Sequence, residues 1–298
     1  MRLLALAAAL LLAAPAPGRG GEEGLRPTTA GAAAGGAVWI GPRPRGAARR
    51  IVSLAPSLTD TLIALGDADR IVGVTRLDRS PEVAGAARVG GFLDPDPEAI
   101  LAARPDLVLW VTDGGALPAI RRTAELAHGA FAILALPVVS VADVIAEARL
   151  VGDAVGDRAA GEALARRAGE ALERLRARGA RGAHRRVLFV VGQDPLVVAG
   201  PGSFPDELLR LAGLVNVVGG DRPWPVYPVE LAIAADPELV IDAAIGEPPG
   251  GMARLAAIPA VARGAVVRLP DDGLLRPGPR MFAALDRLLD ALPAGARR

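Results

Sequence analysis

The chain contains two similar α/β segments, one on each side of its longest predicted helix. In the first segment, Ser57 and Asp60 precede a short apolar stretch that ends at a glycine. Ser203 and Asp206 begin the same pattern in the second segment. A Ser-x-x-Asp pattern before an apolar run is typical of a helix N-terminus, so both places are predicted to begin a capped helix.

A second motif also occurs twice, in the same order. The run from Glu98 to Pro105 resembles the run from Glu230 to Pro237, and an apolar strand-like stretch follows each proline. Chance similarity in an alanine-rich chain is the alternative. Two matched motifs in one order favour duplication of a single α/β unit, which constrains the fold to two like-built lobes.

The stretch between the repeats, Val141 to Gly179, has helical periodicity. We expect helices near 141–154 and 158–178, with Asp157 as the N-cap of the second. An ordinary surface helix is the alternative, but the flanking repeats favour a stiff connector between two lobes. The predicted apolar face consists of Val144, Ala148, Val151, Val155, Leu164, Ala168, Leu172 and Leu175.

Predicted strands alternate with predicted helices on both sides of this connector. This alternation indicates α/β lobes with parallel sheets covered on both faces. The predicted strands are 51–54, 71–74, 107–111 and 131–136 in the first lobe and 187–191, 239–241 and 265–269 in the second, with 197–198 extending or pairing with 187–191. The remaining predicted helices lie at 97–103, 117–127 and 279–291.

The N-terminal region has the composition of an export signal. Arg2 precedes an unbroken apolar run, Leu3 to Ala14, which is short for a membrane span. We therefore expect a signal peptide at 1–18 and a periplasmic or extracellular location; an uncleaved anchor is the alternative. Further along, we expect a flexible linker at 19–49, an N-terminal lobe at 50–138, connecting helices at 139–180 and a C-terminal lobe at 181–298.

Composition excludes several functions. The net charge of +1 over 298 residues gives no electrostatic reason to expect a nucleic-acid partner. Cysteine is absent, which excludes thiolate metal sites, thiol catalysis and disulfides. The two histidines, His128 and His184, have no neighbouring nucleophile or acid pattern. We therefore expect no catalytic residues, no metal site and no intrinsic cofactor.

Ligand binding is the better interpretation of the loops. Ligands of open α/β sheets lie beyond the carboxyl ends of the strands. Pro223 and Pro225 fix the backbone around Trp224, which suits a ring presented to a flat ligand. The alternative is that Trp224 and Tyr227 pack within their own lobe. The predicted ligand-binding residues are Pro56, Ser57, Arg76, Phe92, Asp113, Gln193, Trp224 and Tyr227.

Glu98 and Glu230 occupy equivalent places in the two repeats. Each begins a short predicted helix, where the helix dipole alone favours a carboxylate. Their equivalence suggests a further role, in which one acid from each lobe is presented to a two-fold symmetric partner.

Four motifs resemble a known family. They are Arg50-Ile-Val-Ser-Leu-Ala-Pro-Ser-Leu-Thr-Asp, Val89-Gly-Gly-Phe-Leu-Asp-Pro, Arg104-Pro-Asp-Leu-Val and Pro223-Trp-Pro. Together they resemble the periplasmic substrate-binding proteins of ABC importers that carry cobalamin, haem or iron-siderophores, and the cobalamin group most closely. The resemblance covers the chain from about Arg50 onward.

The resemblance implies two Rossmann-like lobes joined by a single long backbone helix, with the ligand between them. It also implies that Glu98 and Glu230 form salt bridges with arginines of the dimeric permease, and that Trp224 and Phe92 lie near a corrin ring. The chain departs from the family where Arg76 to Pro81 replaces a tyrosine-containing loop. Arginines there instead favour an anionic ligand, such as a haem propionate or a ferric chelate.

We therefore expect a monomeric, exported, non-enzymatic binding protein. It captures a bulky metal-chelate nutrient, a cobalamin or another corrinoid, and delivers it to an inner-membrane ABC permease dimer. Haem or a ferric siderophore is the alternative ligand within the same class. An α/β enzyme and a two-domain interaction or sensor protein are the alternatives from other classes.

Overall fold

The computed structural model describes residues 36–44, 46–112, 118–182, 184–247 and 249–292. They form two compact units. The N-terminal unit contains the described residues up to Gly169 together with Pro277–Pro279, and the C-terminal unit contains Glu170–Arg276 and the described residues from Arg280 onward. The predicted signal peptide at 1–18 lies outside the described residues. No described helix is both long and apolar enough to cross a membrane.

The N-terminal unit is built on a six-stranded sheet with the order β1-β6-β5-β2-β3-β4. All neighbours pair in parallel except β1, which runs antiparallel to β6 at the edge. The central strands β2, β5 and β6 are almost entirely buried, as expected of a parallel sheet covered on both faces. The strands are β1 (Val38–Ile40), β2 (Ile51–Ser53), β3 (Ile71–Val74), β4 (Ala87–Arg88), β5 (Leu107–Val111) and β6 (Ala132–Leu136).

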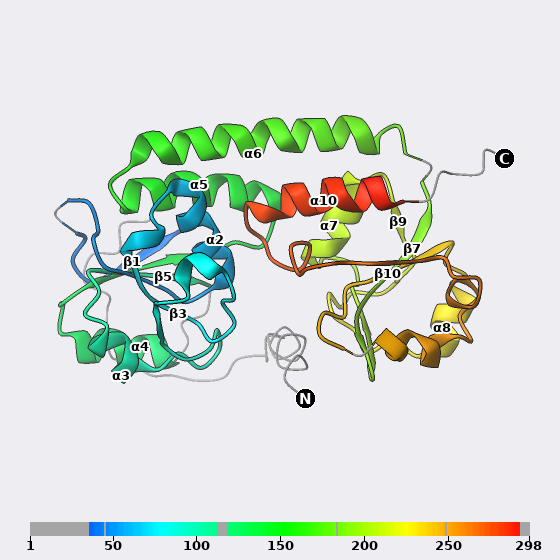
Figure 1. The fold of residues 1–298 in the computed structure, drawn as a ribbon, viewed down its shortest axis with the longest axis horizontal. Coiled ribbons are helices and arrows are strands. Elements are labelled where there is room, and N and C mark those ends of the chain that lie inside the picture. Colours follow the sequence, from blue (N-terminus) through cyan, green and yellow to red (C-terminus); the bar gives the residue numbers. More distant parts are fainter. Residues whose placement is uncertain (1–35, 45, 113–117, 183, 248, 293–298) are drawn as a thin grey trace. The chain divides into compact units, whose positions relative to one another are not determined.

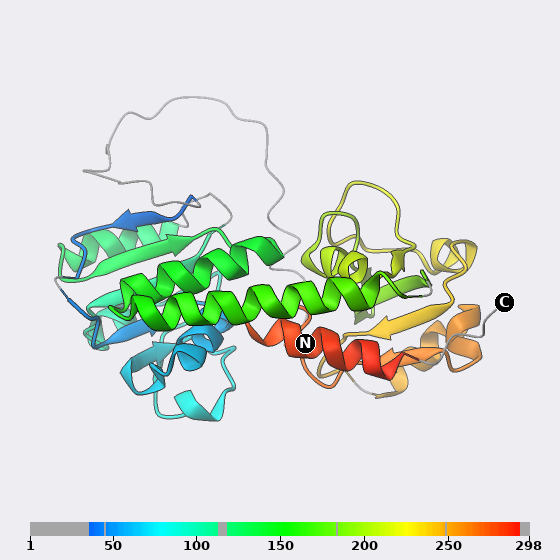
Figure 2. The same ribbon diagram turned by 90° about the horizontal axis from the view of Figure 1, so that it is seen from above.

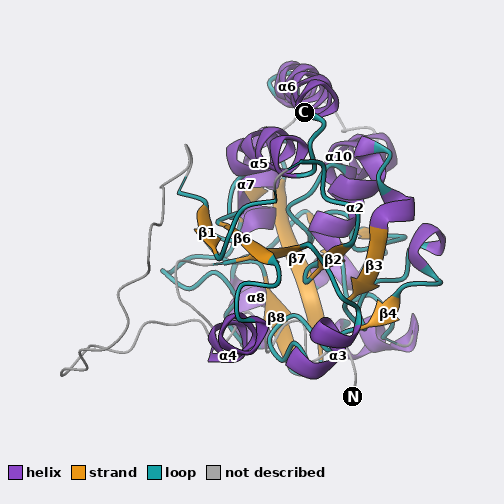
Figure 3. Ribbon diagram, turned by 90° about the vertical axis from the view of Figure 1, so that its left-hand side faces the viewer, coloured by secondary structure: helices purple, strands orange, loops and turns teal. Residues whose placement is uncertain are grey.

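Helices cover both faces of this sheet. α2 (Pro56–Leu65) and α5 (Val141–Ala154) lie on one side, and α3 (Pro97–Ala102) and α4 (Pro118–Ala127) lie on the other (Figures 1 and 3). Two short 3-10 turns, η1 (Ala68–Arg70) and η2 (Pro81–Val83), connect the strands near β3 and β4. The larger core cluster lies between the sheet and α3 and α4, and it includes Trp110 and Phe131.

The C-terminal unit has its own five-stranded sheet. The order is β11-β10-β7-β8, and β9 also pairs with β7. β7, β9, β10 and β11 are parallel, whereas β8 is antiparallel to β7. The strands are β7 (Arg186–Gln193), β8 (Leu196–Val198), β9 (Val215–Asn216), β10 (Leu239–Asp242) and β11 (Val266–Arg268). The two units therefore hold separate sheets, as the repeated motifs predict.

Helices also flank the second sheet. α7 (Phe204–Leu211) and α10 (Arg280–Ala291) lie on one side, and α8 (Val229–Ala234), η3 (Pro249–Leu255) and α9 (Pro259–Ala262) lie on the other (Figure 1). The main core cluster of this unit is formed by β7, β8 and β10 against α8, η3 and α9.

The helix α6 (Arg158–Gly179) begins in the N-terminal unit and ends in the C-terminal unit. Glycines allow it to approach each unit closely. It lies beside α5 (Figure 2), where a Cβ added to Gly152 would be 2.5 Å from the Cα of Gly161. A Cβ on Gly179 would overlap the carbonyl oxygen of Leu211. Arg178 also pairs with Asp286 of α10 at 3.2 Å.

Most predicted elements are confirmed. The predicted helix at 141–154 coincides with α5, and that at 158–178 differs from α6 by one residue. Asp157 accepts a hydrogen bond from the Ala160 amide at 2.8 Å, which confirms its capping role. Strands 71–74 and 107–111 coincide with β3 and β5.

Two predictions are wrong. The flexible linker at 19–49 includes β1, which pairs with β6, and the flanking Ala37 and Ala48 are fully buried. The cap predicted at Ser57 is also absent, because the N-cap of α2 is Ala55. Pro56, with its fixed φ and missing amide hydrogen, suits the first helical position and therefore starts the helix before Ser57 is reached. The corresponding cap at Ser203 is confirmed, since its side chain accepts from the Asp206 amide.

Candidate functional site

The carboxyl ends of β2 to β6 share one edge of the N-terminal sheet, because these strands are parallel. β2 leads directly to Pro56 and Ser57, β3 leads to Arg76, and β4 leads to the turn before Phe92. The sheet thus brings four of the predicted ligand-binding residues to a single edge. Asp113, predicted for the same edge, lies outside the described residues.

Arg76 is a charged group at this edge. Its side chain is exposed and its Nη2 lies 2.8 Å from Asp94 Oδ1. The hydrogen bond with Asp94 raises the pKa of Arg76 from its ordinary value. Its backbone amide donates to the carbonyl of Gly90, which has a φ of +94°, and so couples it to the Gly90–Phe92 turn. Arg76 and the partly exposed Phe92 are therefore held in one loop system that offers a cation and a ring.

Ser57 is less available than its position suggests. It is 6% exposed, and the segment Pro277–Pro279 packs against it. A Cβ on Gly278 would lie 3.2 Å from the Ser57 Cβ. Pro56, immediately before it, is partly exposed. Of these two neighbours, Pro56 therefore offers the greater contact surface.

A buried acid of α5 lies near Asp60 and Thr61 of α2. Glu147 of α5 is 1% exposed, and neither of its carboxylate oxygens has a hydrogen-bond partner among the described residues. Burial raises the pKa of Glu147 to about 8; the Thr61 hydroxyl opposes this shift and the charge of Asp60 adds to it. Thr61 also donates its hydroxyl hydrogen to the Ser57 carbonyl at 3.2 Å. The raised pKa favours the protonated form of Glu147.

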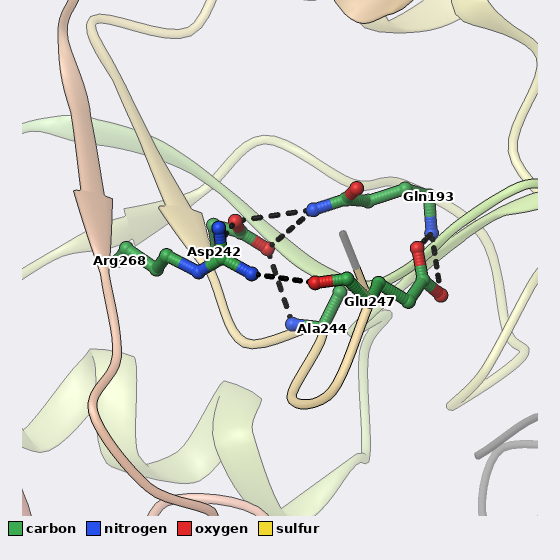
Figure 4. Close-up of polar contacts among 5 residues, drawn as sticks. All are labelled: Gln193, Asp242, Ala244, Glu247 and Arg268. Atoms are coloured by element: carbon green, nitrogen blue, oxygen red, sulfur yellow. Dashed lines mark hydrogen bonds and ion pairs between the residues drawn. The ribbon is translucent and has the colours of Figure 1, made fainter. Parts of the chain in front are cut away.

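The C-terminal unit presents a polar network at the equivalent edge (Figure 4). Gln193, Asp242 and Arg268 are the last residues of β7, β10 and β11, three adjacent parallel strands. Gln193 Nε2 donates to both oxygens of Asp242, at 3.0 and 3.1 Å. Arg268 Nη2 donates to the Glu247 carbonyl at 2.9 Å, and its Nε lies 3.7 Å from Asp242. These polar contacts thereby connect the ends of the strands.

Gln193 has a second feature of interest. Its backbone amide donates to the Glu247 carboxylate, with 3.2 Å between the nitrogen and the nearer oxygen. Its side-chain Oε1 is buried and has no hydrogen-bond partner among the described residues. A Cβ on Gly251 would overlap this oxygen, so the η3 segment covers it closely. The side-chain Nε2 of Gln193 therefore belongs to the polar network, while its unpartnered Oε1 faces η3.

The aromatic loop of the same unit is attached to β8. Amides of Val198 and Gly200 donate to the carbonyls of Pro225 and Pro223, and the Tyr227 amide donates to that of Leu196. Trp224 is 6% exposed, so most of its ring is covered by protein. Tyr227 is partly exposed and packs against the core cluster of its unit. Packing of Tyr227 within its own unit is thus observed, the Trp224 ring is largely covered, and Tyr227 keeps the larger accessible surface.

A hollow of about 290 Å³ lies in the C-terminal unit between the segment after β11 and α10. Its walls are mostly apolar, and the ion pair of Arg287 with Asp271, at 2.7 Å, lines one side. This volume is at the lower limit for small-molecule sites. No group of three or more acidic or histidine side chains suited to hold a metal ion occurs among the described residues.

Glu98 and Glu230 lie in the first turns of α3 and α8, as predicted, and both are exposed. α3 is capped by Asp96, whose side chain accepts from the amides of Glu98 and Ala99. α8 begins after Pro228 without a side-chain cap. The repeat therefore places the two acids equivalently, although their helices begin differently.

Sequence reasoning missed Asp242, Arg268, Glu247 and Glu147. The first two could have been found, because Asp242 directly follows the predicted strand 239–241 and Arg268 lies near the end of the predicted strand 265–269, at the edge where α/β sheets bind ligands. Glu147 falls three residues after Val144, on the predicted apolar face of its helix, and a charged residue at such a position signals a buried carboxylate. Glu247 follows β10 in a loop and carries no comparable signal.

The chain contains two α/β units connected through one helix. In each unit, parallel strands end in polar and aromatic loops. This combination defines the class of two-lobed solute-binding proteins. Residues 51–272 match the periplasmic binding protein family, and the chain belongs to this family. The resemblance inferred from the four motifs is confirmed at this level.

Solved and curated relatives agree with this membership. The crystal structure of the periplasmic vitamin B12-binding protein BtuF of Vibrio cholerae is 26% identical, with a TM-score of 0.69 over 82% of this chain and 96% of that one. The periplasmic heme-binding protein RhuT of Roseiflexus sp. RS-1 is 29% identical, with a TM-score of 0.72 over 83% of this chain and 98% of that one. The vitamin B12-binding protein of Salmonella typhimurium is 28% identical over 264 residues, or 86% of this chain and 92% of its own length.

Proposed function

We propose that this protein captures a corrinoid, such as cobalamin, outside the cytoplasm and delivers it to an ABC permease. The observation that carries the proposal is the similarity to vitamin B12-binding proteins over more than four fifths of the chain. The loops at the carboxyl ends of the strands support it, because they combine rings with polar groups, as pockets for large planar ligands require.

The residues we assign to ligand contact are those that offer surface at these edges. Phe92 and Tyr227 are partly exposed rings, Pro56 adds apolar surface, and Arg76 provides a cation. Trp224 supports the loop that carries Tyr227, and Gln193 orders the strand ends through Asp242. Ser57 and Asp113 belong to the same proposed edge.

Haem is the second candidate ligand. It is favoured by the similarity to the Roseiflexus heme-binding protein and by two exposed arginines, Arg76 beside the Gly90–Phe92 turn and Arg79 three residues further on. Arginine pairs readily with carboxylates such as propionates. Because Arg76 is already paired with Asp94, Arg79 is the arginine we expect to bind a propionate in that case.

A titration of the purified protein separates these candidates. Tryptophan fluorescence would be followed while cyanocobalamin, cobinamide, haemin and a ferric siderophore are added in turn. We expect saturable quenching by the two corrinoids with dissociation constants in the range of about 1 μM or lower. Replacement of Phe92 or Tyr227 by Ala should weaken binding by about tenfold each, as expected for the loss of a stacked ring. If only haemin binds, the ligand is haem and not a corrinoid. If none of the four compounds binds, the proposal is contradicted.

Glu98 and Glu230 are proposed to dock on the permease dimer through its arginines. Both carboxylates are exposed at equivalent positions of the two units. The double variant Glu98→Arg, Glu230→Arg should abolish uptake of labelled cyanocobalamin by cells while ligand affinity of the purified protein stays unchanged. The matched control reverses Glu82 and Glu125, exposed acids elsewhere in the chain. Normal uptake in the docking variant would contradict this assignment.

Export is proposed to depend on residues 1–18 as a signal peptide, with periplasmic location as in the family. We further propose that the protein acts as a monomer and as a binding protein without catalytic residues or an intrinsic cofactor. Mass spectrometry of the protein from a periplasmic extract would test the first point, since cleavage near residue 18 predicts a mature chain that lacks the apolar run.

A further inference from the structure

The short helix α8 exposes more apolar surface than a helix of its size normally does. Leu231 is 50% exposed and Ile233 is 37% exposed, and the preceding Val226 is 56% exposed. Single exposed apolar side chains need no explanation, but Leu231 and Ile233 lie in one helix of six residues, and we call these two side chains the apolar patch of α8. Water contact with such a patch is unfavourable by about 25 cal/mol for each Å² of apolar surface, so a partner that covers it gains stability.

The patch surrounds Glu230. Successive residues of a helix are about 100° apart, which places Leu231 on one side of Glu230 and Ile233, three residues on, about 60° away on the other side. Ala232 faces the core and is fully buried. The carboxylate of Glu230 therefore sits at the centre of an arc that has an apolar side chain on each side. We call Glu230, Leu231 and Ile233 the α8 arc.

The equivalent helix of the N-terminal unit lacks this feature. In α3 the residues that correspond to Leu231 and Ile233 are Ala99 and Leu101, and both are partly buried against the core cluster of their unit. Within α3, Glu98 therefore has no exposed large apolar neighbour, although Leu93 before the helix is 40% exposed, and the helix N-terminus is capped by Asp96. The two repeats place an acid at the same position, but only the C-terminal one surrounds it with exposed apolar side chains.

We propose that the α8 arc is an apolar contact surface for the permease, and that docking is asymmetric, with the C-terminal unit supplying the larger share of the binding energy. This inference rests on the proposed function. The partner chemistry it defines is a basic side chain surrounded by apolar surface. A cation that pairs with Glu230 while Leu231 and Ile233 exclude water forms a stronger contact than the same pair in solvent, because the local dielectric is lower.

The test uses the full mature protein and membranes from spheroplasts that contain the cognate importer, so that no ligand has to be identified. The double variant Leu231→Ser, Ile233→Ser keeps Glu230 and replaces only exposed side chains. Its affinity for the membranes should fall about tenfold or more. The matched control, Leu126→Ser with Val139→Ser, removes two other exposed apolar side chains and should bind like the wild type. Glu230→Arg should weaken binding more than Glu98→Arg.

The outcomes are distinguishable. If the wild type binds and both single charge reversals weaken binding, but the serine variant binds normally, the proposed function stands and the α8 arc is not a contact surface. If the wild type does not bind the membranes, the delivery function fails and the inference fails with it. Sedimentation of the purified proteins provides the last check. A dimeric wild type with a monomeric serine variant would assign the arc to a second copy of the chain and overturn the proposal.

Discussion

The two units share a plan but use the same motif differently. Both contain Ser-x-x-Asp before an apolar run, yet Ser203 caps α7 whereas Ser57 lies inside α2. The difference follows from Pro56, which occupies the first helical position and leaves Ala55 as the N-cap. A repeated motif therefore predicts a repeated helix, while the residue beside the motif decides how that helix begins.

A larger difference between the units concerns the acids near the first helix of each unit, α2 and α7. In the N-terminal unit, the buried Glu147 interacts with the charge of Asp60 of α2 and has no hydrogen-bond partner for its oxygens among the described residues. In the C-terminal unit, Asp206, the counterpart of Asp60, accepts a hydrogen bond from the Asn216 side chain at 2.9 Å, and the described residues of that unit include no buried acid with an unpartnered side-chain oxygen. The first helix of the N-terminal unit should therefore be the more pH-sensitive of the two.

The largest expected effect comes from Glu147. Because burial raises its pKa from 4.5 to about 8, the folded protein holds a proton that the unfolded chain loses above pH 4.5. Its contribution to stability is present below that pH and is lost as the pH rises to about 8, by on the order of 5 kcal/mol at most. Glu147→Gln, which cannot lose a proton, should unfold at similar urea concentrations to the wild type at pH 4.5 and at clearly higher ones at pH 8.

The control for this experiment is Glu173→Gln, an exposed acid of α6 that pairs with Arg176 at the surface. It should change stability by less than about 1 kcal/mol at either pH. If Glu147→Gln destabilised the protein equally at both pH values, Glu147 would be a partnered carboxylate and the contrast between the units would be lost.

The next effect tests how α6 attaches to each unit. Gly161 meets Gly152 of α5, and Gly179 meets the backbone at Leu211. Gly161→Ala and Gly179→Ala should each destabilise the protein by about 1–3 kcal/mol, because the neighbours are backbone atoms that cannot rotate away. Thermal unfolding would be followed by circular dichroism.

Gly169 of the same helix is the matched control, since a Cβ there would meet no atom within 4 Å. Gly169→Ala should raise stability by about 0.5–1 kcal/mol, as expected for alanine in a helix interior. Equal behaviour of all three variants would show that glycine content, rather than close packing against the units, determines the stability of α6.

The smallest effect sharpens the comparison of the two motifs. Ser203→Ala removes a helix cap and should cost about 1 kcal/mol. Ser57→Ala removes no cap and should cost less than about 0.5 kcal/mol, the usual size for a change that breaks no specific interaction. Denaturant unfolding of both variants would measure this difference. A larger loss for Ser57→Ala would mean that its hydroxyl has a structural role in α2.

Much of the fold could be predicted because the periodicity is strong. Val144, Ala148 and Val151 define one face of α5, and all three are buried. β1 could not be predicted in the same way, because it lies in a stretch rich in Gly, Pro and Arg and forms only by pairing with β6, far away in the sequence. Local patterns do not contain such pairings.

The residues at the strand ends could be predicted from the sequence, but their side-chain contacts could not. Strand ends identified Arg76 and Gln193, because parallel strands bring their carboxyl ends together. That Gln193 binds Asp242, and that the Trp224 ring is largely covered, depends on side-chain packing among distant segments. The exposure of Leu231 and Ile233 likewise depends on which side of α8 meets the core, and the buried Ala232 is too small to indicate this in the sequence.

The most direct test of the account is a crystal structure of the full mature chain with the ligand that binds most tightly in the titration. The account predicts a bulky metal chelate in contact with the strand-end loops, through Phe92 and Arg76 of the N-terminal unit or through Tyr227 of the C-terminal unit. A ligand seated in the hollow beside α10, or one that touches neither set of strand-end loops, would contradict it.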